Sequence, residues 1–147
     1  MQPADIAVFD RQDRPVLIAE VKAKKRSSPE WAAMLRRNLE THRISPAAKY
    51  FLVATPSDFY FWLERPGAGQ PLRPDFQVDT QSVLEPHLRS EWEPAGLSGG
   101  AFEILVASWL NSLVQGHGEE RLPAGLAEWL RNHGVLEAMR GGHVEQH

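Results

Sequence analysis

Asp5, Glu20 and Lys22 are the residues of this sequence whose types and spacing point most directly to chemistry. Asp5 stands directly before one short apolar run, and Glu20 and Lys22 close the next apolar run along the chain. Two carboxylates that face each other repel, and a bound divalent cation would offset that repulsion. Hard oxygen ligands of this kind suit Mg²⁺ or Mn²⁺. The sequence therefore indicates a metal site, provided that the chain brings Asp5 and Glu20 together.

A β-hairpin would bring these two carboxylates together. The apolar runs Ile6–Phe9 and Pro15–Val21 are typical of two strands, and the polar segment Asp10–Arg14 is typical of the turn between them. If the turn is centred between positions 12 and 13, residues whose numbers add up to 25 lie opposite each other. This register places Asp5 opposite Glu20, with Cβ atoms roughly 5 Å apart.

The same register predicts that Phe9 faces Val16. Glu20 and Lys22 are two residues apart, so their side chains project from the same face of their strand. Asp5, Glu20 and Lys22 are therefore expected to converge at one end of the hairpin. The alternative is that these charged residues end the strands simply because the strands end at the protein surface.

An aspartate, then a hairpin, then Glu-x-Lys is a pattern that resembles the PD-(D/E)XK, or restriction-endonuclease-like, nuclease superfamily. In this sequence it reads Pro3-Ala4-Asp5 and then Glu20-Val21-Lys22. In the superfamily the proline usually adjoins the aspartate, whereas Ala4 intervenes here. The resemblance extends over about residues 3 to 65, and it looks most like small proteins related to the N-terminal nuclease domain of type I restriction enzymes.

The resemblance implies a restriction-endonuclease-like fold of the α/β (α+β) class, in which helices flank a mixed central β-sheet. It also implies a Mg²⁺- or Mn²⁺-dependent deoxyribonuclease that hydrolyses phosphodiester bonds. Asp5 and Glu20 would hold the metal, with the backbone carbonyl of Val21 as a third ligand. Lys22 would orient or help to deprotonate the attacking water and would stabilise charge on the phosphate. DNA is the expected partner, and RNA stays open as an alternative.

The fold of this superfamily normally begins with a helix that packs on the sheet and often supplies another acidic residue to the metal site. Only four residues precede Asp5. We therefore expect this helix to be missing, or to be replaced by another part of the chain or by a partner, as in a homodimer. Two rival interpretations follow: a catalytically inactive nuclease fold that binds nucleic acid, and an oligomeric interaction module.

Charge is unevenly distributed along the chain. The formal net charge is −3, but residues 1–66 carry 11 Lys and Arg against 8 Asp and Glu, whereas residues 67–147 carry 5 against 11. Basic residues gather just after the proposed site, where they could meet phosphates. The candidates for nucleic-acid binding are Lys24, Lys25, Arg26, Arg36 and Arg37. An ordinary solvated helix face with salt-linked arginines is the alternative.

The composition suits one globular domain, because the chain has 147 residues of which 42% are hydrophobic. The absence of cysteine excludes disulfides, thiolate metal sites and a cysteine nucleophile. The six histidines show no zinc-like spacing. No apolar stretch is long enough to span a membrane, and the amino terminus does not read as a signal peptide. A cytoplasmic protein is therefore expected.

Within the nuclease-like part, helical spacing predicts a helix from Pro29 to His42. Its inward-facing side chains are expected to be Trp31, Met34, Leu35 and Asn38 or Leu39. Two buried strands are expected to follow, over residues 50–55 and 59–63. A helical crossover followed by a hairpin predicts a mixed sheet.

The single domain is expected to consist of a nuclease-like core over residues 1–66, a loop-rich connection over 67–97 and a helical extension over 98–142. The connection includes a short strand over 75–79 and a short helix that starts at Thr80. Ser98 reads as the cap of a long amphipathic helix over about 100–115, and two shorter helices follow between Leu122 and Arg140. The last residues, including His143 and His147, are expected to form a flexible tail.

Overall fold

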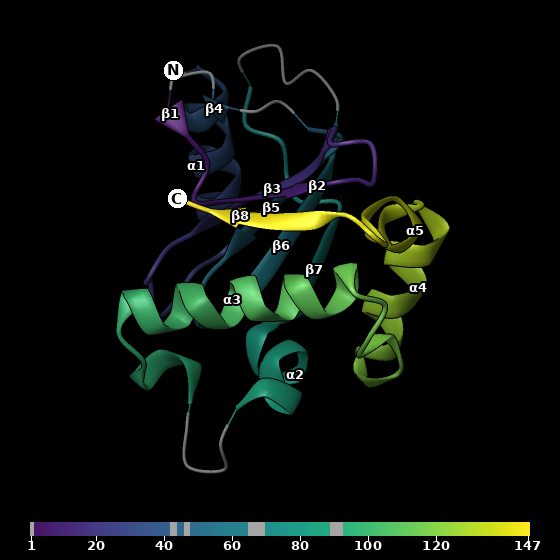
Figure 1. Cartoon of the computed structure of the whole chain (residues 1–147). Helices are drawn as coiled ribbons and strands as arrows, with labels where there is room; N and C mark the ends of the chain where they lie inside the picture. The colour runs from purple at the N-terminus through teal and green to yellow at the C-terminus, as the bar shows by residue number, and fades with distance from the viewer. Residues whose placement is uncertain (1, 42–43, 46–47, 65–69, 89–92) are drawn as a thin grey trace.

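The computed structural model shows a mixed α+β architecture built on a six-stranded sheet (Figure 1). It describes residues 2–41, 44–45, 48–64, 70–88 and 93–147. The strand order is β7-β6-β5-β3-β2-β8; only the central pair β3–β5 is parallel. The strands are β2 (Ile6–Phe9), β3 (Pro15–Val21), β5 (Tyr50–Ala54), β6 (Asp58–Leu63), β7 (Phe76–Asp79) and β8 (His143–Gln146). A separate parallel pair consists of β1 (Gln2–Pro3) and β4 (Ile44–Ser45).

Helix α1 (Pro29–Thr41) makes the crossover between the parallel strands β3 and β5 and covers one face of the sheet. Ala32 of this helix is fully buried against Tyr60 and Trp62 of β6, and Trp31 and Leu35 pack around the same cluster. The small alanine faces the bulky aromatic rings of the sheet, and the larger side chains of the helix lie beside it. The helix therefore exists as predicted, and its predicted end at His42 lies outside the described residues.

The predicted inner stripe of α1 is wrong at Met34, whose exposed fraction is 45%. Of the other predicted residues, Leu39 is buried and Trp31 and Leu35 are partly buried against the core, and the helix also buries Ala32, Ala33 and Arg36. Rotating the helix in this way turns a methionine to solvent and an arginine inward. The prediction relied on large apolar residues and therefore missed Ala32, which packs against the aromatic surface of the sheet.

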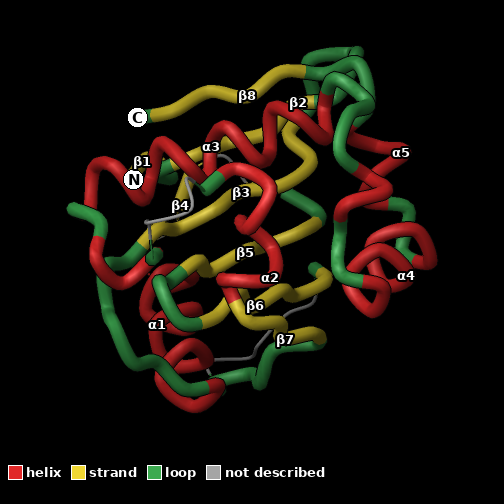
Figure 2. The backbone as a smooth tube through the Cα atoms, turned by 90° about the horizontal axis from the view of Figure 1, so that it is seen from below, coloured by secondary structure: helices red, strands yellow, loops and turns green. Residues whose placement is uncertain are grey.

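The opposite face of the sheet is covered by the helices of the C-terminal half (Figure 2). These are α2 (Thr80–Leu84), α3 (Gly99–Val114), α4 (Ala124–Asn132) and α5 (Val135–Met139), joined by short 3₁₀ turns over Glu85–His87, Pro94–Gly96 and Glu119–Arg121. Helix α3 runs across the strands and buries Phe102, Val106 and Trp109 against them. Sandwiching the sheet between α1 and α3 leaves its central strands buried on both faces, which explains why β3, β5 and β6 read as nearly continuous apolar runs.

Ser98 caps the N-terminus of α3, as predicted, because its side-chain oxygen accepts a hydrogen bond of 3.1 Å from the backbone N–H of Ala101. Replacing Ser98 by alanine leaves that N–H without its partner. We expect the Ser98→Ala variant to lose about 1 kcal/mol of unfolding free energy, measured by urea denaturation. Replacement by glycine should cost only a few tenths of a kcal/mol, and equal losses for both variants would contradict a capping role.

The predicted flexible tail is wrong. Residues His143–Gln146 form β8, which pairs antiparallel with β2 at the edge of the sheet. Val144 packs against the main core, and the ring of His143 stacks on Phe9 with 4.9 Å between ring centroids. The last strand of the chain therefore forms an edge of the sheet, next to β2, which is the first strand of this sheet in chain order. No helix within the described residues is long and apolar enough to cross a membrane.

Candidate active site

The hairpin that carries the predicted site has the predicted register over most of its length. Ile6 pairs with Ala19, Ala7 with Ile18 and Val8 with Leu17. In each pair the residue numbers add up to 25. The prediction fails only next to the turn, where Phe9 pairs with Pro15 instead of Val16, because a bulge shifts the register between Val8 and Phe9.

The turn itself explains the bulge. Asp10 N–H donates to the Arg14 carbonyl, while the Asp10 carboxylate accepts hydrogen bonds from the backbone N–H groups of Gln12 and Arg14. Asp13 adopts a left-handed conformation with φ of 64°, which aspartate tolerates better than most residues. The hydrogen bond from the Arg14 backbone is the main reason why the pKa of Asp10 lies below its ordinary value. This self-contained turn fixes the hairpin at the end remote from Asp5 and Glu20.

At the other end of the hairpin, Asp5 bridges the start of β2 and the end of β3. Its Oδ2 atom accepts a hydrogen bond of 2.8 Å from the backbone N–H of Val21. Its backbone carbonyl accepts a second hydrogen bond of 2.8 Å, from the N–H of His147 after β8. These two bonds hold the Asp5 carboxylate beside the last residues of β3, which carry Glu20 and Lys22.

Glu20 lies near the end of β3, a central strand of the sheet, and only 1% of its surface is exposed. Its Oε2 atom lies 4.0 Å from the Lys22 ammonium, and its Oε1 atom has no hydrogen-bond partner in the part of the chain that the structure describes. Burial, and then the hydrogen bond and negative charge of Asp5, raise the pKa of Glu20 to about 8, although Lys22 opposes the shift. The carboxylate therefore needs either a proton or a cation.

The position of Glu20 follows from the alternation of side chains along β3. Ile18 and Glu20 point to the face of the sheet that α1 covers, whereas Leu17 and Ala19 point to the α3 face. Lys22 continues the pairing with β5, because its N–H donates to the Ala54 carbonyl at 3.0 Å. Its side chain is 41% exposed. The ammonium group of Lys22 therefore stands between the buried carboxylate and solvent.

Asp5 and Glu20 are the two acidic side chains available to a cation at this point. No group of three or more His, Cys, Asp or Glu among the described residues is placed to hold a metal ion. Two carboxylates are nevertheless sufficient for Mg²⁺, which usually keeps several waters and takes one or two carboxylates together with the phosphates of its substrate. The unpaired buried oxygen of Glu20 fits this pattern. The Val21 carbonyl stays a predicted ligand.

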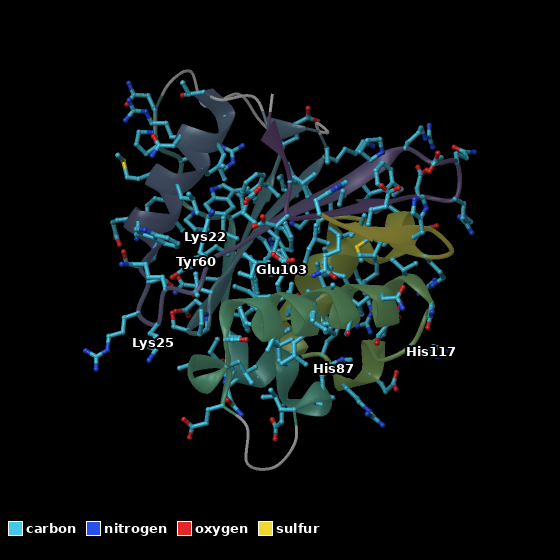
Figure 3. The ribbon with its side chains drawn as sticks, turned by 60° about the vertical axis from the view of Figure 1, so that its left-hand side comes forward. Lys22, Lys25, Tyr60, His87, Glu103 and His117 are labelled. Carbon is cyan, nitrogen blue, oxygen red and sulfur yellow. The ribbon has the colours of Figure 1, made fainter. Side chains whose placement is uncertain are left out.

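A cluster of four hydroxyl groups lies at the same end of the parallel strands as Lys22. Ser27 Oγ is 2.8 Å from Thr55 Oγ1, 2.8 Å from Ser57 Oγ and 2.7 Å from the Tyr60 hydroxyl. Figure 3 shows Tyr60 next to Lys22. Sequence reasoning missed this cluster. The only available signal was that Thr55 and Ser57 flank a turn directly after a buried strand.

The hydroxyl cluster attaches the basic loop, Lys24–Arg26, to the sheet. The three residues of this loop are exposed, and Ser27 follows them directly. Lys24 lies over the ring of Trp31, with 5.6 Å from Nζ to the ring centroid. Lys25 projects away from the body of the protein (Figure 3). The loop therefore presents positive charge at the end of the sheet where Glu20 and Lys22 lie.

Arg36 does not belong to this basic surface. Its side chain is 7% exposed, forms an ion pair of 2.6 Å with Glu40 and lies over the ring of Trp62. A guanidinium in this position faces the interior and is not available to a phosphate. The phosphate contact predicted for Arg36 is therefore corrected, and the ion pair with Glu40 agrees with the alternative of a salt-linked arginine. Arg37 is half-buried on the same helix, and nothing in the structure ties it to the site.

No protein-family model, curated protein or solved structure matches this chain. What the chain does must therefore be inferred from its own residues. The structure brings Asp5, Glu20 and Lys22 together as the sequence predicts, adds the four hydroxyls and removes Arg36.

Proposed function

We propose that the chain is a metal-dependent nuclease with a restriction-endonuclease-like arrangement, which hydrolyses phosphodiester bonds in DNA. One observation carries this proposal: the carboxylate of Glu20 is buried with an unpaired oxygen, faces the carboxylate of Asp5 and has the Lys22 ammonium 4.0 Å away. A protein that used these residues only for stability would gain more from an apolar side chain, because an unpaired buried carboxylate is costly.

The residues would divide the work as follows. Bound Mg²⁺ would lower the pKa of a coordinated water and polarise the phosphate. Asp5, held by the Val21 N–H, would keep its free oxygen aimed at the cation. Glu20 would give up its proton when the cation binds, and Lys22 would stabilise negative charge that develops on the phosphate. Lys24, Lys25 and Arg26 would hold the DNA backbone without sequence preference.

The arrangement of helices supports the proposed fold. Helix α1 covers the face of the sheet to which Glu20 points, and α3 covers the other face. In the superfamily a helix that precedes the first strand packs on the sheet. We take α3, from the C-terminal half of the chain, as the helix that packs on this face of the sheet.

A titration with Mg²⁺ or Mn²⁺ in the presence of supercoiled plasmid and single-stranded DNA tests the proposal. We expect metal-dependent nicking that falls at least about a hundredfold in Lys22→Ala, because charge stabilisation at the phosphate is lost. Lys49→Ala is the matched control, since Lys49 is exposed just before β5, at the opposite end of the parallel strands. Equal nicking by both variants would contradict the assignment.

One observation favours a second candidate function, a nuclease fold that binds nucleic acid without cutting it. Among the described residues the site offers two carboxylates and no third acidic ligand. This candidate predicts DNA binding that weakens with salt and persists in Lys22→Ala, with no nicking at any metal concentration. The same titration distinguishes the two functions.

A further inference from the structure

A hollow lies far from the proposed nuclease site, on the outer side of α3. Its volume is about 350 Å³. One wall comes from α2 and the 3₁₀ turn that follows it, and the other comes from the C-terminal end of α3 and the segment after it. Figure 3 shows His87 and His117 here, well away from Lys22 and Tyr60. Since Glu20 points to the α1 face, the sheet and α3 separate the two places.

The hollow combines an apolar floor with nitrogen donors. Val83, Trp109 and Leu122 line it and are almost completely buried. His87 and Arg121 line its wall. Burial, and then the charge of Arg121, lower the pKa of His87, so its imidazole is neutral at pH 7 and its N–H can donate. An apolar pocket with a few convergent polar groups is the usual form of a small-molecule site.

The segment that carries His117 has a defined shape. Gly116 and Gly118, on either side of it, have φ values of 78° and 82°, a conformation that other residues rarely adopt. The His117 N–H donates to the Ser112 carbonyl at 2.8 Å. The backbone therefore fixes His117 at the rim of the hollow. Its imidazole has no hydrogen-bond partner among the described residues.

Arg121 is the positive charge of the hollow. Its guanidinium forms no hydrogen bond or ion pair with any other part of the chain that the structure describes, so its five N–H donors are available. Glu120 also lines the hollow and is exposed. This carboxylate disfavours a ligand with several negative charges. The combination selects a ligand with one anionic group and an apolar remainder.

We propose that this hollow binds a small organic monoanion, whose carboxylate accepts hydrogen bonds from Arg121 and His87 and whose apolar part packs against Pro86 and Leu122. A guanidinium matches a carboxylate with two parallel hydrogen bonds, which gives direction as well as affinity. The proposal is independent of the nuclease function, because it uses none of the residues of that site.

Binding of benzoate to the full chain, followed by ¹H–¹⁵N NMR, tests the proposal. Benzamide is the matched neutral probe, since it has the same ring and nearly the same shape. We expect benzoate to shift the amide signals of Ser112, His117 and Arg121, and benzamide to bind at least about tenfold more weakly, the loss of one charge-assisted hydrogen bond.

The protein control uses two exposed arginines. Arg121→Ala should weaken benzoate binding at least about tenfold, whereas Arg11→Ala, in the hairpin turn, should leave it unchanged. Unaltered melting temperatures would show that both variants fold. Equal affinity for benzoate and benzamide, full binding by Arg121→Ala, or no shift at the three amides would each overturn the proposal.

Discussion

Replacing Glu20 by glutamine should make the protein more stable at pH 8 and at the same time abolish metal-dependent cleavage. Glutamine keeps the shape of the side chain, and its N–H₂ group can donate to the nearby Asp5 carboxylate. The variant removes a negative charge that is buried against a second carboxylate. A stability gain combined with a loss of activity is expected where a residue is kept for chemistry and not for the fold.

The sign of the pH effect follows from the pKa of Glu20. Its ordinary value is 4.5, and the folded protein raises it to about 8. Below pH 4.5 the group is protonated in both states and costs nothing. Between these two values only the unfolded chain releases the proton, so the wild-type free energy of unfolding falls as pH rises. At pH 8 the loss should amount to a few kcal/mol, and Glu20→Gln should not show it.

Urea denaturation at pH 5, 6, 7 and 8 in the presence of a chelator measures this difference. Glu128→Gln is the control, because it makes the same change at a residue that is exposed on α4. Added Mg²⁺ should restore part of the wild-type stability at pH 8 by binding the ionised pair. If the free energy of unfolding depends on pH in the same way in wild type and Glu20→Gln, the ionisation of Glu20 does not destabilise the folded protein.

Replacing Gly142 by alanine should detach β8 and cost several kcal/mol of unfolding free energy. A Cβ atom at this position would lie 1.7 Å from the Phe9 carbonyl oxygen and 2.8 Å from the Phe9 carbonyl carbon. Both atoms belong to the backbone of β2, so they cannot move aside without breaking the pairing of the two strands. Glycine is required here by the close approach of two backbones.

Gly100→Ala is the matched control for this prediction. Gly100 lies in the first turn of α3, and a Cβ atom there would meet nothing within 4 Å. Alanine should leave stability unchanged or raise it by up to about 1 kcal/mol. Hydrogen exchange of the β8 amides should rise only in Gly142→Ala. Protected β8 amides in that variant would show that the strand tolerates the added methyl group.

The hairpin and its carboxylates could be predicted because the information is local. Two apolar runs and one polar turn define the strands, and the register that the turn sets then places Asp5 opposite Glu20. The long helix α3 was predicted from its cap and its apolar spacing. The mixed α+β class is confirmed, and it follows from a helix between two buried strands.

The parts that could not be predicted depend on contacts between distant segments. In β8, Val144 is the only apolar residue, because an edge strand with one face on the core needs little more. The hydroxyl cluster joins Ser27 to Thr55, a contact that exists only once β3 and β5 pair in parallel. The inward turn of Arg36 depends on the shape of the aromatic surface beneath α1.

The pairing of β2 with β8 has a consequence for the order of folding. It joins Ile6 to Gln146, so all the residues between these two must be synthesised before β2 gains its second neighbour. Closing so long a loop costs more entropy than forming the local β2–β3 hairpin, and contacts of this kind form slowly. During synthesis the outer edge of β2 is therefore unpaired, and an unpaired strand edge is the place where another chain can add. A nascent chain of this protein therefore exposes the edge of β2 until β8 has been made and has paired with it.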